Sequence, residues 1–78
     1  MKVYVLTLEY SNDATIVSVF TTLGNAQMAV KEVEYDPKEC YPRIIQFDLT
    51  KEFDNVNRKS GPLPVWVFDK SVNKWQAW

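Results

Sequence analysis

The chain has 78 residues, a formal net charge of −1 and no histidine, and 46% of its residues are apolar. A chain of this length forms one domain, residues 1–78, and buries roughly 60% of the surface that its unfolded form exposes, so its stability depends on a dense core or on a partner. Without histidine, no Ser-His or Cys-His nucleophile and no imidazole metal ligand is available. We therefore expect a protein that is not an enzyme and that needs no metal or cofactor.

The charge and the cysteine content indicate what the protein can bind and where in the cell it is expected. A net charge of −1 gives no global basic field, so we expect no binding to duplex nucleic acid. The single cysteine, Cys40, excludes an intrachain disulfide. The apolar run that starts at Lys2 is too short to span a bilayer and does not resemble a signal peptide. These features predict a cytoplasmic protein that does not bind a membrane.

Two strands are predicted first, over Lys2–Tyr10 and Ile16–Thr22. The polar residues between them, Asn12 and Asp13 in particular, suit a tight hairpin turn. Side chains alternate between the two faces of a strand, and here both faces are apolar. This pattern is typical of central strands that are covered on both sides.

A helix is predicted next, because the apolar period changes from two to about three and a half. Thr22 is a good N-cap, and the apolar stripe of Ala26, Ala29, Val30 and Val33 follows it. Pro37 disfavours a helical conformation at the preceding residue, so we expect the helix to end near Tyr35.

The second half of the chain adds strands over Arg43–Thr50, Val65–Asp69 and Lys74–Trp78, with a long polar loop over 51–62. In the first of these strands we expect Ile45, Phe47 and Leu49 to face the core, with Ile44 as the exception. The order β-β-α-β-β(-β) predicts an α+β fold: an antiparallel or mixed sheet of four or five strands with one helix on one face.

One helix cannot cover a sheet of this size, and a large exposed apolar patch usually marks an interface. We therefore expect a homo-oligomer or a protein that binds another protein. The candidate interface residues are the apolar side chains of the first hairpin: Tyr4, Leu6, Leu8, Tyr10, Val17 and Val19.

Aromatic and basic residues gather near the C-terminal end of the chain, a mixture that suits stacking on a base beside a phosphate. The alternative is that these aromatics fill the core or a subunit interface. The candidate ligand-binding residues for a nucleotide are Arg58, Lys59, Trp66, Phe68, Lys74, Trp75 and Trp78.

Acid–base or thiol chemistry has weaker support. Asp48 with Glu52, or Asp54 with Asp69, would need a water-poor cleft to separate their pKa values, and the sequence does not indicate one. Cys40 lacks the histidine that usually activates a thiol nucleophile.

The first half of the chain resembles a loose group of small proteins from bacteriophages and mobile elements. The resemblance lies in Lys2-Val3-Tyr4-Val5-Leu6-Thr7, Glu9-Tyr10, Val19-Phe20-Thr21-Thr22 and Ala26. It implies a β-β-α unit and a role in the host cytoplasm. Some phage proteins of this size antagonise host defence by binding a defence protein or by sequestering a nucleotide signal, so the resemblance implies a host protein or a nucleotide as partner.

Overall fold

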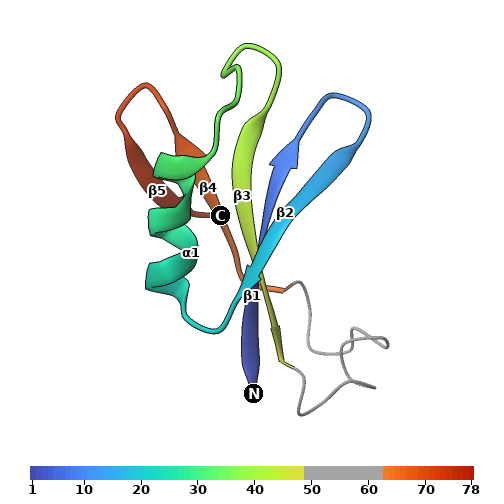
Figure 1. The fold of residues 1–78 in the computed structure, drawn as a ribbon, viewed down its shortest axis with the longest axis vertical. Helices are drawn as coiled ribbons and strands as arrows, with labels where there is room; N and C mark the ends of the chain where they lie inside the picture. Colours follow the sequence, from blue (N-terminus) through green and yellow to red (C-terminus); the bar gives the residue numbers. More distant parts are fainter. Residues whose placement is uncertain (49–62) are drawn as a thin grey trace.

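The structure is a computed structural model that describes residues 1–48 and 63–78. Its elements are β1 (Lys2–Glu9), β2 (Ala14–Phe20), α1 (Leu23–Ala29), the 3-10 helix η1 (Val30–Glu32), β3 (Tyr41–Asp48), β4 (Val65–Asp69) and β5 (Lys74–Ala77). The five strands form one antiparallel sheet in the order β2-β1-β3-β4-β5, with α1 on one side of it (Figure 1). The predicted α+β fold is confirmed. The predicted strand residues Leu49 and Thr50 and the predicted loop 51–62 lie outside the described residues.

Strand β1 is a central strand, as its two apolar faces predicted. It pairs with β3 along its whole length, from Lys2 opposite Asp48 to Glu9 opposite Tyr41. Strand β2 has the same two-faced pattern but lies at the edge of the sheet, with every residue before Phe20 exposed. The expectation of a second central strand is therefore wrong, because the chain leaves β2 directly for α1 and β3 takes the other side of β1.

The helix begins where the sequence predicts. The Thr22 hydroxyl accepts a hydrogen bond from the Asn25 backbone N–H at 3.2 Å, which caps the first turn. After Ala29 the backbone tightens into η1, and Val33 is extended, so the helical region ends before Tyr35. The acidic residues near this end oppose the helix dipole and do not favour a further turn. Among the described residues, no helix is long and apolar enough to cross a bilayer.

The core lies between α1 and the sheet. Leu6 of β1, Ala26 of α1 and Ile44 of β3 are fully buried and form its centre. Because Ala26 has a small side chain, the helix packs close to the strands. Half-buried apolar residues surround this centre: Tyr4, Phe20, Leu23, Ala29, Val33, Trp66 and Trp75.

The indole of Trp75 ties the far edge of the sheet to the helix. Its Nε1–H donates a hydrogen bond to the Gln27 backbone carbonyl at 3.1 Å, and its ring meets that of Phe68 edge-on at 5.3 Å. A buried indole N–H usually finds such a partner. Trp75 thus belongs to the packing of α1 against β4 and β5.

The face of β3 that turns to the core differs from the prediction. Leu6 lies opposite Ile44 in the sheet, and both contact the core, so Ile45 and Phe47 point to the opposite face. The expectation that Ile45 and Phe47 face the core is therefore wrong. Both faces of β3 are apolar, so the position of α1 decides which face is buried.

Two neighbouring isoleucines of β3, Ile44 and Ile45, test which face of the strand is buried. We expect Ile44→Ala to lower the free energy of unfolding by about 2–5 kcal/mol, because it leaves a cavity in the core. Ile45→Ala should cost less than about half as much, because its side chain is partly exposed on the other face. Urea unfolding of both variants measures the difference, and equal losses would contradict the assignment of faces.

Candidate binding surface

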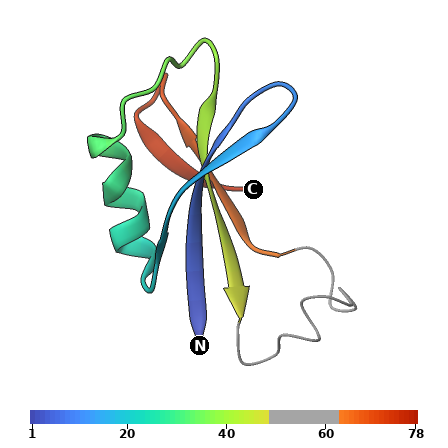
Figure 2. The same ribbon diagram turned by 45° about the vertical axis from the view of Figure 1, so that its right-hand side comes forward.

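The face of the sheet that is turned away from α1 is the most distinctive surface of the molecule, and we call it the open face. No described helix or strand lies over it (Figures 1 and 2). The strand registers, together with Trp78 beyond β5, place its residues: Val3, Val5, Thr7, Glu9, Ile16, Val19, Tyr41, Arg43, Ile45, Phe47, Val65, Val67, Gln76 and Trp78. Most of these side chains are apolar, and four of the large ones are exposed: Ile16, Val19, Tyr41 and Trp78. Exposed apolar side chains that gather on one face mark a binding surface.

On the β2–β1 half of the open face, the exposed apolar side chains come from β2. Ile16 is 68% exposed and Val19 is 55% exposed. Ile16 lies opposite Thr7, and Val19 lies opposite Val5, with an irregularity in the register that leaves Val17 without a partner residue in β1. Strand β2 carries no charged residue and no proline, the features that usually protect an edge strand from association.

Polar side chains form a closed network near the centre of the open face. The Arg43 guanidinium lies 3.0 Å from Glu9 Oε2, and the Thr7 hydroxyl donates a hydrogen bond to the same oxygen at 2.7 Å. The Glu9 side chain is largely buried, while that of Arg43 is partly exposed. Since the two charges neutralise each other, the centre of this face presents little net charge to a partner.

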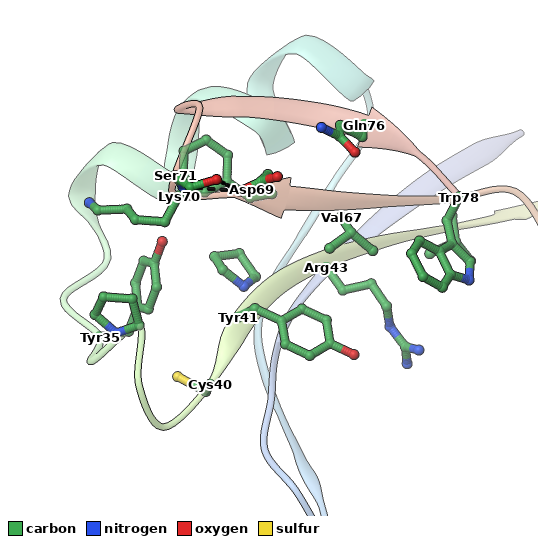
Figure 3. A pocket seen from close by; sticks show the side chains of 14 residues that line it. Tyr35, Cys40, Tyr41, Arg43, Val67, Asp69, Lys70, Ser71, Gln76 and Trp78 are labelled. Carbon is green, nitrogen blue, oxygen red and sulfur yellow. Dashed lines mark hydrogen bonds between the residues drawn. The ribbon is translucent and has the colours of Figure 1, made fainter.

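A groove of about 620 Å³ runs over the β3–β5 half of the open face (Figure 3). Val65 and Val67 line it with apolar surface, Tyr41 and Trp78 are exposed along it, and the Arg43 guanidinium projects between their two rings in the view of Figure 3. Its other lining residues come from the chain segment that enters β3, from β3, from β4 and the turn after it, and from β5: Tyr35, Pro37, Cys40, Pro42, Phe68, Asp69, Lys70, Ser71 and Gln76. The volume falls within the usual range for small-molecule sites.

Two polar atoms of this groove lack partners. Tyr35 Oη and Arg43 Nε are buried and make no hydrogen bond to any described residue. Burial raises the pKa of the Tyr35 hydroxyl, so this group stays protonated and is a donor at neutral pH. Lys70 Nζ lies 5.8 Å from the centre of the Tyr35 ring, on its face. Buried donors without acceptors are rare in folded proteins, and two of them line the same groove.

Asp69 lines the groove and is the last residue of β4. The Ser71 hydroxyl at 2.6 Å and the Ser71 backbone N–H at 3.0 Å both donate to Asp69 Oδ1. These hydrogen bonds lower the pKa of Asp69 below its ordinary value. The carboxylate is thus committed to the turn, which also contains Asn73 with φ 55°.

The structure divides the predicted nucleotide-binding residues among different places. Trp66 and Trp75 pack against the core beneath α1, and Phe68 meets the Trp75 ring there. Trp78 lies in the groove and is 89% exposed, while Lys74 is exposed at the start of β5. Arg58 and Lys59 lie outside the described residues. Among the predicted residues that the structure describes, Phe68 and Trp78 line the groove, and Trp78 is the one whose side chain is exposed there.

The predicted interface residues are divided in the same way. Leu6 and Leu8 are buried on the helix side, and Tyr4 packs against the core there, so a partner cannot reach them in the folded chain. Val19 lies on the open face. Val17 and Tyr10 are also exposed. Strict alternation would place Ile16 on the face opposite to Val19, but the irregularity in the register puts both on the open face, so the alternation expected for the second strand is wrong at this point.

Tyr41, Arg43 and Gln76 are among the residues of this surface that were not predicted. The available signal was their spacing, since Tyr41 and Arg43 alternate in one strand and Gln76 and Trp78 in another, so each pair shares a face. The strand order that brings the two pairs together was not readable from the sequence.

Cys40 is buried beside the chain segment that precedes β3, and its thiol lies 3.8 Å from the Asp36 carbonyl oxygen. Its contact with Tyr10 raises the pKa of that phenol, which therefore stays protonated at neutral pH. In residues 1–48 and 63–78, no cluster of three or more acidic or cysteine side chains is arranged to hold a metal ion.

The chain matches no protein-family model, no curated protein and no solved structure. Its function is therefore inferred from the geometry and chemistry of the open face.

The pair of Glu9 and Arg43 can be tested by a double-mutant cycle in urea unfolding. We expect Glu9→Gln and Arg43→Met to be coupled by about 1–2 kcal/mol, because either single change leaves a partly buried polar group unpaired. Thr7→Val, which removes the neighbouring hydroxyl, is the control for loss of packing. A coupling below about 0.5 kcal/mol would show that the pair is screened by solvent.

The hydrogen bonds of Asp69 predict a pH-dependent effect of Ser71→Ala. Because the pKa of Asp69 is lowered in the folded state, its stabilising effect is present above the unfolded pKa of about 3.9 and is lost as the pH falls through the folded value. Thermal unfolding followed by circular dichroism should show a lower Tm for Ser71→Ala at pH 7 and no difference at the acid end. Ser11→Ala, in the exposed β1–β2 turn, should show no such trend.

Proposed function

We propose that this chain is a non-enzymatic protein-binding module that uses the open face of its sheet, and that its first partner is a second copy of itself. The observation that carries this proposal is the uncovered apolar surface around Ile16 and Val19. Strands β1 and β3 are apolar on both faces, and α1 covers one of these faces, so a second layer is needed to cover the other. A partner that supplies this layer adds to the stability of a small domain with a thin core.

A second copy fits the open face for reasons of charge and shape. Glu9 and Arg43 already neutralise each other, and the chain carries a net charge of −1, so two copies repel each other weakly. Two twisted sheets pack face to face at about −30° with a spacing of about 10 Å, and their β-branched side chains interdigitate. The valines and isoleucines of β1, β2 and β3 suit this packing.

A wider proposal concerns the biological partner. The first half of the chain resembles small phage and mobile-element proteins, some of which bind host defence proteins. We propose a host protein as the partner that the chain binds in a cell, on the same open face. A non-enzymatic mode of action is supported by the lack of histidine and by Asp69, whose carboxylate is engaged by Ser71.

Lysine substitutions on the two faces of β2 test self-association. We expect wild-type protein to sediment as a dimer at micromolar concentration, and Ile16→Lys to weaken the dimer by more than about 30-fold, because the ammonium group would be buried without a partner. Thr15→Lys is the matched control, since Thr15 is exposed on the same strand but pairs with Leu8 and points to the other face. Circular dichroism confirms that both variants fold.

The outcomes separate the modes of binding. Loss of the dimer in Ile16→Lys with retention in Thr15→Lys supports packing through the open face. Equal loss in both variants indicates pairing through the exposed edge of β2 instead. A wild-type chain that stays monomeric at high concentration contradicts self-association.

A further inference from the structure

We infer that the groove on the β3–β5 half of the open face is a binding site for a flat heterocycle that carries hydrogen-bond acceptors, of which a nucleobase is the natural class. The site consists of Trp78 and Tyr41 as stacking surfaces and of Tyr35 and Arg43 as donors. It is separate from the Ile16 and Val19 surface that carries the proposed self-association, and it would remain if that proposal failed.

The two rings supply the area for a flat ligand. Trp78 is 89% exposed and Tyr41 is 45% exposed, and both line the groove (Figure 3). The Trp78 backbone N–H donates to the Val65 carbonyl at 2.8 Å, so its position beside β4 is fixed although its side chain is exposed. An exposed indole held by a backbone hydrogen bond beside an apolar groove is suited to stack on a heterocycle.

The unpaired donors define what the ligand must carry. Tyr35 Oη and Arg43 Nε each have a proton to donate and no acceptor among the described residues, although both atoms are buried. Each lost hydrogen bond of this kind destabilises the free chain, and a ligand that supplies acceptors removes that penalty. Carbonyl oxygens and ring nitrogens of a nucleobase are such acceptors. Tyr35 and Arg43 lie toward opposite ends of the groove in the view of Figure 3, so a single ligand that accepts from both must span the groove.

The charges of the groove favour a base over an isolated anion. The Arg43 guanidinium is paired with Glu9, and the Asp69 carboxylate is occupied by Ser71. Lys70 contributes an exposed ammonium group near Tyr35, where a charge contact is screened by solvent. Binding therefore depends on stacking and on neutral acceptors, and a phosphate group adds little to it.

The test is an NMR titration of the full chain with adenosine, uridine, their 5′-monophosphates and inorganic phosphate. We expect the nucleosides to shift the Trp78 indole N–H and the Arg43 Nε–H signals, and inorganic phosphate to leave them unchanged. Each nucleoside and its monophosphate should bind within about fivefold of each other, because an exposed charge contact contributes little. No shift at millimolar nucleoside, or shifts with inorganic phosphate alone, would overturn the assignment.

Two variants and a control test which side chains of the groove contribute to nucleoside binding. Trp78→Ala should weaken nucleoside binding by at least about fivefold through loss of stacking. Tyr35→Phe should weaken it by about 2- to 10-fold and leave the unfolding midpoint equal or higher, because it removes a buried hydroxyl that has no partner in the free chain. Val72→Ala, exposed and outside the groove, should bind like wild type. Unchanged affinity in Tyr35→Phe or in Trp78→Ala would overturn the site.

The same titration on Ile16→Lys keeps the two proposals apart. If the groove binds nucleosides as a monomer, Ile16→Lys should give the shifts of wild type. If Ile16→Lys no longer self-associates but still binds nucleosides, the groove is a binding site of the single chain, as inferred. If a folded Ile16→Lys chain no longer binds nucleosides, the groove depends on the dimer and the inference of a separate site is wrong.

Discussion

The structure depends on one packing contact, that of Ala26 against Leu6 and Ile44. All three residues are fully buried, and they join the helix to the two central strands. Both central strands are apolar on each face, so the sheet itself has no preferred side. The small side chain of Ala26 lets α1 approach one side of the sheet closely. The side that α1 covers then determines which residues of β1 and β3 are buried, because side chains alternate along a strand.

Because α1 covers one side of the sheet, the two sides carry different kinds of apolar side chains. The helix side takes Trp66 and Trp75, which fill the space between a short helix and the far strands. The other side keeps the valines and isoleucines that a second layer would cover in a larger fold. The closed network of Glu9, Arg43 and Thr7 at its centre lets this surface be apolar and nearly neutral without leaving an unpaired charge.

The sequence predicted the elements well and their surroundings less well. Thr22 and the alanine spacing fixed the start and the buried face of α1, because both signals are local. The faces of β3 and the edge position of β2 depend on which strand lies next to which, and no local pattern encodes that neighbour. In the C-terminal strand, alternation places Trp75 and Trp78 on opposite faces of the sheet, but the sequence does not say which of the two faces the helix covers.

The two halves of the open face are far enough apart to act independently. Ile16 on β2 and Trp78 beyond β5 are separated by four strand spacings, which is about 19 Å at 4.8 Å for each step. A partner that covers β2 and β1 therefore need not reach the groove over β4 and β5. Because the Glu9 and Arg43 pair lies between them, a partner that displaced Glu9 would also release the Arg43 guanidinium and increase its positive charge toward the groove.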